Sequence, residues 1–390
     1  MSACSSSPIL NVVDQFGSSP IEVVTASADL LGALAAVPDP RARRGVRHGF
    51  VAILAVGVCA VLAGARTFTA IAEWAHDLPV GMRVRLGLGR LAPSESTIRR
   101  NLQAVDADAV DGAISAWLVA RAATAIPAVA PAVRMIAIDG KSARGARGPK
   151  GRAVHLLAAF DQANGLVLGQ GVVDGKTNEI TAFAPLLDRI DITGAIITAD
   201  ALHTQHRHAD YLIGRGAHYV LTVKRNQPSL HRQLRALPWA QTPAVDVTRD
   251  KGHGRVESRT LKLAAVTAGI GFPHARLAIQ LIRRRRTLTN HKWHTETVYA
   301  ITDLPWNQIR ADQIAETIRG HWGIENRLHW IRDVVFAEDH SQIRTRNAPA
   351  VMATLRNLAV SLHRLTGATN IAAACRHVSR HPNRILPLLT

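Results

Sequence analysis

The chain has 390 residues, which is long enough for two or three domains. Hydrophobic residues make up 47% and charged residues 19%, a composition that excludes wholesale disorder, a collagen-like fibre and a coiled coil. Lys and Arg number 47 against 29 Asp and Glu, a formal net charge of +18, so we expect a polyanionic partner, with nucleic acid the best candidate.

Three dispersed cysteines, Cys4, Cys59 and Cys375, cannot build a disulfide framework or a CxxC zinc site, so we expect a cytoplasmic protein. The longest apolar run, 50–65, is shorter than the ~20 residues of a membrane span. We predict a buried helix there, with a membrane segment as the alternative. The N-terminus lacks the basic-then-apolar order of a secretion signal, which argues against export.

Residues 1–25 are rich in serine and are predicted to be mobile, and 26–130 are predicted to be all-helical. Cap residues and apolar periodicity place helices at 26–37, 50–63, 67–77, 94–105 and 107–124. The helix after Ser94 resembles a recognition helix, with Arg99 and Arg100 near its start. The preceding helix is too distant for a compact helix-turn-helix, so a structural role is an equally open alternative.

Beyond residue 130 the pattern changes to short apolar or β-branched runs between turn residues, which predict strands at 134–139, 153–160, 166–173, 195–199 and 218–223. Helices are predicted at 179–188 and 204–214, so we expect a mixed sheet flanked by helices. The basic segment 228–308 has its own strand candidates and is predicted to be a β-rich insertion. Helical patterns return at 311–333 and 349–365. The predicted catalytic unit is therefore 131–227 with 309–370, followed by a tail over 371–390.

Two acids end predicted strands. Asp139 ends the first strand, in AIDGKSARG, and Asp200 ends the fourth, in IITADALHT. Open α/β sheets bind ligands at the carboxyl ends of their strands, and neighbouring strands would project both carboxylates into one crevice. The alternative is that each Asp only forms a turn.

A third acid, Glu325, lies in the helical pattern IRGHWGIENRLHWIRD. Helical spacing places His321, Glu325 and His329 on one stripe. An ion pair with Arg332 or Arg319 is one interpretation, since a buried Glu requires a partner, and a zinc site on the stripe is another. The third interpretation is that Glu325 converges with the two strand-end aspartates on divalent cations.

Three carboxylates suit Mg²⁺, which prefers oxygen ligands and is typically held by one or two carboxylates plus substrate phosphate. Two such ions ~4 Å apart activate an attacking water or 3′-hydroxyl and stabilise the leaving oxygen of a phosphodiester. Together with the +18 charge, this chemistry predicts a DNA-cutting enzyme that uses two Mg²⁺ or Mn²⁺ ions.

Several motifs in a fixed order over about 30–365 resemble the DDE transposases of bacterial insertion sequences, in particular the ISAs-type group that includes the H-repeat-associated proteins. They are PDPRARRGVRH, AIDGKSARGA, ITADALHTQ, YVLTVKRNQP, HGRVESR and HWGIENRLHWIRDVVFAEDHSQIR. The resemblance implies a catalytic fold like ribonuclease H, a transposase-associated DNA-binding domain at the N-terminus, and catalytic, metal-binding acids at Asp139, Asp200 and Glu325.

The sequence departs from the wider family around the glutamate, where Tyr, Arg, Glu and Lys usually stand at fixed spacing. Here those positions hold Ile318, His321, Glu325 and Arg332, so only the last basic partner remains, and we expect it to hold a phosphate. Asp333, Glu338 and Asp339 are rival third acids that do not fit the motif.

The predicted DNA contacts are basic or aromatic residues near these acids or on the insertion and the N-terminal unit. They are Lys141, Arg144, Arg147, Lys224, Arg225, Arg255, Arg259, Arg283, Arg284, His321, Trp322, Arg332, Arg99 and Arg100.

The basic residues have alternative interpretations. The segment 140–152 is predicted to be a flexible basic loop, either over DNA or merely solvated. Arg255 and Arg259 flank Glu257 on one strand face, as a salt-bridged strand or as a contact surface. The run 283–286 is either a solvated face or a DNA contact.

We therefore expect a transposase that binds the inverted-repeat ends of its own element as double-stranded DNA, cleaves them and joins the 3′-hydroxyls to target DNA. We expect it to be associated with the nucleoid and not with membranes. A homodimer is a possible form when two DNA ends are brought together. The alternatives are a domesticated nuclease and a catalytically inactive DNA-binding protein derived from such an enzyme.

Overall fold

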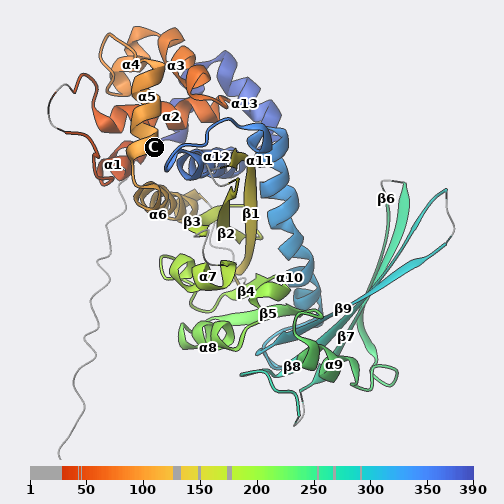
Figure 1. Cartoon of the computed structure of the whole chain (residues 1–390). Helices are drawn as coiled ribbons and strands as arrows, with labels where there is room; N and C mark the ends of the chain where they lie inside the picture. Colours follow the sequence, from red (N-terminus) through yellow and green to blue (C-terminus); the bar gives the residue numbers. More distant parts are fainter. Residues whose placement is uncertain are drawn as a thin grey trace, which may run out of the picture.

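The computed structural model describes residues 29–42, 44, 46–125, 133–147, 151–173, 178–252, 254–266, 269–289 and 292–390. A cluster of helices lies at one end and a nine-stranded sheet occupies the middle, its outermost strands extending away as a long arm (Figure 1). The predicted mixed α/β architecture is confirmed at this level. The mobility expected for 1–25 falls outside the described residues.

The N-terminal helices are α1 (Leu30–Ala35), α2 (Phe50–Leu62), α3 (Phe68–Asp77), α4 (Val80–Arg85), α5 (Glu95–Ala104) and α6 (Ala107–Ala125). Asp29, Thr67 and Ser94 accept hydrogen bonds from backbone N–H groups and so define where α1, α3 and α5 begin. α2 is buried along nearly its whole length, as predicted, and no helix in the described ranges is long and apolar enough to cross a bilayer. The short α4 was not predicted.

The five predicted strands are present as β1 (Met135–Arg147), β2 (Ala153–Asp161), β3 (Val167–Val173), β4 (Ile196–Ala199) and β5 (His218–Val223). Their spatial order is β3-β2-β1-β4-β5, with β2 antiparallel to its two neighbours and β4 parallel to its own. β1 is longer than predicted. Its backbone continues to pair with β2 over 140–147, so this stretch of the predicted loop is strand.

Four antiparallel strands form the arm: β6 (Ala244–Gly252), β7 (Arg255–Ala265), β8 (Leu277–Thr287) and β9 (His294–Thr302), preceded by α9 (Pro228–Arg235). β9 pairs with β5, so the β-rich segment predicted to be an insertion continues the same sheet in the order β5-β9-β8-β7-β6. The division of the chain into domains stays a prediction, although the backbone hydrogen bonds run without a break from β3 to β6.

Helices cover both faces of the sheet. One face packs on α7 (Glu179–Leu187) and α8 (His206–Gly214), and the other on α10 (Ala311–Ile324) and α12 (Ala348–Leu365). α10 continues through a π-helical turn, η2 (Glu325–His329), into α11 (Trp330–Val334), where the sequence predicted one regular helix. The remaining elements are the 3₁₀ turns η1 (Ala201–His203), η3 (Glu338–His340) and η4 (Pro382–Leu388) and the helix α13 (Ile371–Arg380).

α12 joins the helical cluster to the sheet. Nearly all of its side chains are buried, and one hydrophobic core runs from Leu54 of α2 and Ile114 of α6 through Leu355 of α12 to Phe160 of β2. At about 1.5–3 kcal/mol for each large apolar side chain removed from water, this core holds the two parts together strongly. The position of the sheet relative to the N-terminal helices is therefore fixed by packing.

Candidate active site

Asp139 and Asp200 lie side by side where the parallel pairing of β1 with β4 ends, directly after Ile138 and Ala199, and the backbones of such a pair are about 4.8 Å apart. β4 ends there, but β1 continues to Arg147, so the prediction that Asp139 ends its strand is wrong. Thr198, two residues before Asp200 and so on the same sheet face, has its hydroxyl 3.0 Å from Nδ1 of His321 on α10. Asp200 therefore faces the side of the sheet that α10 covers.

Glu325 and His329 approach Asp139 from the π-helical turn η2. His329 Nδ1 lies 3.2 Å from Glu325 Oε2 and 3.5 Å from Asp139 Oδ2. One ligand atom from each of the three residues lies within 4.8 Å of the other two. π-helical turns often occur at functional sites, where the extra residue changes the direction of side chains. The structure thus brings the first and third predicted acids together.

Asp200 is outside that three-residue cluster. Its Oδ1 accepts a hydrogen bond of 2.7 Å from the backbone N–H of Leu202 and caps η1. It is nevertheless close enough to act on Asp139 electrostatically, since it helps to raise the pKa of that carboxyl. The structure therefore confirms that β1 and β4 are neighbours, and it gives Asp200 the turn-forming hydrogen bond that the sequence analysis left open as the alternative.

The electrostatics of the cluster fit a divalent cation. Burial, together with the charges of Glu179, Asp200 and Glu325, raises the pKa of Asp139 to about 7. The hydrogen bond with His329 lowers the pKa of Glu325. Carboxylates that repel one another in this way are the usual surroundings of a hard cation, and two carboxylates with one imidazole form a suitable donor set.

Glu179, His155 and His203 form a second polar cluster that the sequence analysis missed. His155 Nε2 lies 2.6 Å from Glu179 Oε1 and His203 Nε2 lies 3.2 Å from Oε2. Burial opposes ionisation of Glu179, but these two hydrogen bonds outweigh it and lower its pKa to about 2. Two features of the sequence could have indicated this cluster: Glu179 stands in the first turn of α7, and His203 follows Asp200 closely.

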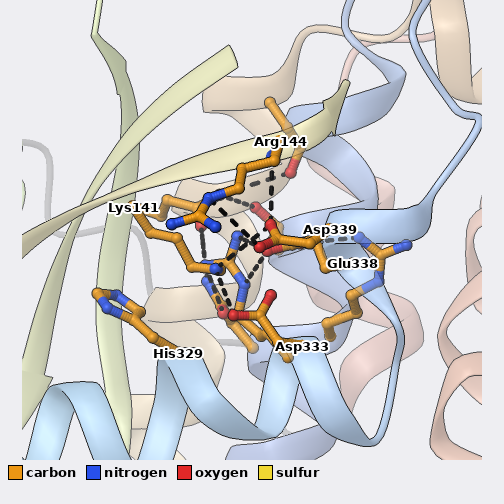
Figure 2. A network of polar contacts seen from close by, with 12 residues as sticks. Lys141, Arg144, His329, Asp333, Glu338 and Asp339 are labelled. Carbon is orange, nitrogen blue, oxygen red and sulfur yellow. Dashed lines mark hydrogen bonds and ion pairs between the residues drawn. The ribbon is translucent and has the colours of Figure 1, made fainter. Parts of the chain in front are cut away.

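Arg332, predicted to hold a DNA phosphate, is instead fully buried and paired with a protein carboxylate. Its Nε donates to Glu338 Oε2 at 2.8 Å and its Nη1 to Gln170 at 3.1 Å, while its Nη2 lies 2.7 Å from the same Glu338 oxygen as an ion pair. Arg356 donates to the other oxygen of Glu338 at 2.8 Å. Glu338 is 1% exposed, and Figure 2 shows it within a network of polar contacts. Glu338 is therefore excluded as a rival metal ligand, and Glu325 pairs with His329 rather than with Arg332.

The other two rival acids neutralise Lys141. Its Nζ lies 2.7 Å from Asp333 and 3.6 Å from Asp339, and Figure 2 shows Asp333 and Asp339 on either side of it. The side chain is only 8% exposed, so Lys141 is a buried ion-pair partner rather than the free loop lysine that was predicted. Arg144 also approaches Asp339, at 3.7 Å, but is 77% exposed.

The His321, Glu325 and His329 stripe, for which a zinc site was one alternative, does not form. His321 points to Thr198 and lies outside the cluster of Asp139, Glu325 and His329. Burial lowers the pKa of His321 to about 4, which leaves a neutral imidazole unsuited to an ion pair with phosphate. The neighbouring Trp322 is 59% exposed.

Arginines of the arm are held by one buried acid. Glu257 is 4% exposed and pairs with Arg259 at 2.6 Å, Arg283 at 2.6 Å and Arg255 at 3.8 Å, so the salt-bridged interpretation of this strand is correct. The Arg283 guanidinium also lies over the ring of Trp322, 5.7 Å from its centroid, and so links the arm to α10.

Several predicted DNA contacts are exposed. Arg147, Lys224, Arg225, Arg284 and Arg100 all have solvent-exposed side chains, and Arg284 lies over the ring of Trp293 at 5.0 Å. Arg99 is partly exposed and pairs with Glu95 at 3.0 Å, one helical turn before it.

Comparison with known proteins identifies the family. A family model described as the transposase DDE domain matches residues 133–362, and a second, described as associated with that domain, matches 31–118. The chain belongs to the DDE transposase family. This DDE transposase is 30% identical over 353 residues to YncI of Escherichia coli O157:H7, which carries the name of a transposase, covering 86% of this chain and 87% of that protein.

Relatives in the H-repeat group support the same assignment. YhhI of Escherichia coli K12, which carries the name of an H repeat-associated transposase, is 29% identical over 350 residues, covering 85% of this chain and 89% of that protein. Among solved structures, a piggyBac transposase synaptic complex with hairpin DNA matches at 12% identity and a TM-score of 0.39, over 92% of this chain and 76% of that one. Membership of the family implies a DNA partner and a divalent metal.

Proposed function

We propose that this DDE transposase binds the inverted-repeat ends of its own insertion sequence, cleaves phosphodiester bonds there and transfers the freed 3′-hydroxyls to target DNA. One observation carries the proposal: Asp139, Glu325 and His329 converge where the parallel pairing of β1 and β4 ends, with Asp200 directly after β4. The proposal also includes a ribonuclease H-like catalytic fold, which the strand order β3-β2-β1-β4-β5 supports.

The catalytic roles follow from these positions. Asp139 and Glu325 would hold one Mg²⁺ or Mn²⁺, with His329 positioning Glu325 through its hydrogen bond, and Asp200 would complete a second ion site with substrate phosphate. Bound divalent cations lower the pKa of the attacking water or 3′-hydroxyl and stabilise the leaving oxygen. Asp139 is 27% and Glu325 60% exposed, so a cation and a phosphate can reach both carboxylates from solvent.

Exposed basic and aromatic residues around the acids would hold the DNA. Lys224 and Arg225 follow β5, which is parallel to β4, and Trp322 lies on the helix that leads to Glu325. Arginines contact backbone phosphates and fix the register of the duplex without reading sequence. Trp322 offers a face on which an unpaired base can stack. Such a protein would be nucleoid-associated, and it would act as a homodimer if one protomer held each end.

The test is cleavage of duplexes that carry the terminal repeats, with Mg²⁺, by wild type and by Asp139→Asn, Asp200→Asn and Glu325→Gln. Each variant should lose cleavage by at least about 10³-fold and keep DNA affinity, since only the ion sites are changed. Glu316→Gln, an exposed acid on α10, is the matched control and should cleave normally. Full cleavage by any of the three variants contradicts the assignment.

The inactive DNA-binding alternative makes the opposite prediction for wild type. It predicts retention of repeat-end DNA in EDTA without product in either Mg²⁺ or Mn²⁺. A duplex that is bound and never cut by wild type would therefore favour that alternative over a transposase.

A further inference from the structure

A basic hollow on the N-terminal helical cluster lies apart from the acids. It has a volume of about 840 Å³ and is bounded by residues 41, 42, 44 and 46–48, by α5 and by the segment just before α12. Its basic lining residues are Arg41, Arg44, Arg47, His48, Arg100 and Arg346, and no described lining residue is acidic. We propose that this hollow binds the phosphate backbone of DNA and is the main DNA contact of the helical cluster.

Most of the positive charge in the hollow is not neutralised by protein. Arg41 is the exception, because it pairs with Asp39 at 2.7 Å and donates to the carbonyl of His48, which braces the segment. Arg44, Arg47 and Arg346 are exposed and, within the described ranges, have no carboxylate at ion-pair distance. Like charges gathered around one hollow repel each other, and a polyanion would offset that repulsion.

Buried polar atoms without partners point to a ligand. His48 is 8% exposed, and its Nδ1 is buried without a hydrogen-bond partner among the described residues. Asn101 is 5% exposed; its amide nitrogen donates to Thr97, whereas its Oδ1 has no partner in the described chain. Such orphaned groups are rare in native structures unless a ligand or water satisfies them. A neutral His48 with its proton on Nδ1 can donate to a phosphate oxygen, and Asn101 Oδ1 can accept from a nucleobase amino group.

The wall chemistry favours a nucleic acid strand over a small anion. Ser94 and Thr97 bring hydroxyls at the start of α5, and hydroxyls with arginines are the usual phosphate contacts of duplex DNA. Val46 and Leu91 add exposed apolar surface, 44% and 64% exposed, which an inorganic ion would not use and a sugar or base would cover.

Arg346 ties the hollow to the catalytic part of the chain. Its backbone has a φ of 51°, a left-handed conformation that non-glycine residues rarely adopt. The next residue, Asn347, donates from its side chain to the carbonyl of Val105 at the end of α5. The segment that leads into α12 is therefore fastened to α5, and the hollow is built jointly by the helical cluster and by the sequence that follows the acids.

This inference rests on the proposed function and adds the surface that holds the DNA. The test uses the full chain in EDTA, with fluorescence anisotropy of a labelled repeat-end duplex at several salt concentrations. The variant is Arg44→Gln, Arg47→Gln and Arg346→Gln combined. The matched control is Arg66→Gln, Arg85→Gln and Arg90→Gln combined, which removes the same charge from exposed positions elsewhere on the cluster.

The hollow variant should weaken binding at least about 10-fold and reduce the slope of log K against log[salt] by about 2 to 3, one phosphate contact per arginine. The control should change the affinity less than about 3-fold. Equal losses in the two variants, or no binding by wild type, would overturn the proposal. A third result would also overturn it: inorganic phosphate raises the Tm of wild type, but the hollow variant binds DNA as tightly as wild type does. That result would describe a site for a small anion.

The two proposals fail separately. If the hollow variant loses DNA affinity as expected and wild type shows no Mg²⁺-dependent cleavage, the catalytic proposal fails while the DNA site stands. If wild type cleaves and the hollow variant binds like the control, the DNA site fails while the catalytic proposal stands.

Discussion

The carboxylate of Glu179 lies directly against Gly140, the residue that follows Asp139 in β1. A Cβ atom built on Gly140 would meet the Glu179 carboxylate below 3 Å at all three of its nearest atoms. Any side chain at 140 must therefore displace Glu179 from His155 and His203. Position 140 requires glycine because Glu179 approaches its backbone closely, and its backbone angles play no part. Through this contact the second polar cluster touches β1 next to Asp139.

Gly140→Ala should impair cleavage by disturbing the part of β1 that carries Asp139, without unfolding the chain. The displaced Glu179 would release His155 and His203, and His203 lies three residues after Asp200. A shift of about 1 Å in catalytic geometry costs on the order of 10²-fold in rate, so we expect a loss of that size in single-turnover cleavage of repeat-end DNA. Gly112→Ala on α6, where a new Cβ meets nothing within 4 Å, is the control and should cleave like wild type. Normal cleavage by Gly140→Ala would show that Glu179 can move freely.

Glu338→Gln should destabilise the protein strongly, because it leaves Arg332 and Arg356 buried with their anion removed. Breaking a buried ion pair by removing one partner typically costs about 3–5 kcal/mol. Burial opposes ionisation of Glu338, but the two arginines hold its pKa at about 2 in the folded state. Urea unfolding at neutral pH measures the loss, with the exposed Glu316→Gln as the comparison. A change below about 1 kcal/mol would mean that the network contributes little.

Asp111 should make folding less favourable as the pH rises from about 4 to 6. Burial raises its folded-state pKa from 3.8 to about 6, so over this interval the unfolded chain is ionised while the folded carboxyl still holds its proton. A shift of this size corresponds to about 3 kcal/mol. The unfolding free energy of wild type minus that of Asp111→Asn should therefore fall by about that amount between pH 4 and 7. A difference that stays constant or rises with pH would contradict this sign.

Divalent cations should stabilise the folded protein through Asp139 and Glu325. A ligand that binds only the folded state at 100 times its Kd adds about 2.7 kcal/mol, which appears as a rise in Tm. We expect Mg²⁺ and Mn²⁺ to raise the Tm of wild type, and Asp139→Asn to abolish most of the rise. Glu316→Gln should keep it. An equal rise in wild type and Asp139→Asn would assign the cation effect to another place.

The strands β1 to β5 could be predicted because apolar runs and turn residues are local signals. Asp200 followed from its place after β4, whereas Asp139, predicted to end its strand, lies inside the longer β1. The burial of Arg332 could not be predicted, since its partner Gln170 is 162 positions away in the chain and reaches it only through folding, although its other partner, Glu338, is six residues on. The same holds for 140–147, whose glycine and arginine content suggests a loop. There the backbone of Ser341 lies so close to Gly145 that no side chain fits, and this packing keeps the segment in the sheet.

The π-helical turn was also beyond sequence reasoning. A regular helix places His321, Glu325 and His329 on one stripe, whereas the turn over Glu325–His329 separates His321 from the other two. The type of element was predicted correctly. The direction of its side chains depended on one local change of helical pitch.

The unbroken backbone ladder from β1 to β6 has a mechanical meaning. Strands that share one ladder cannot swing past each other without breaking hydrogen bonds, so the arginines at 283–286 in β8 keep a set distance from Asp139 in β1. If a duplex contacted both places, this constant distance would set the number of base pairs between the segment bound by the arm and the bond that is cut.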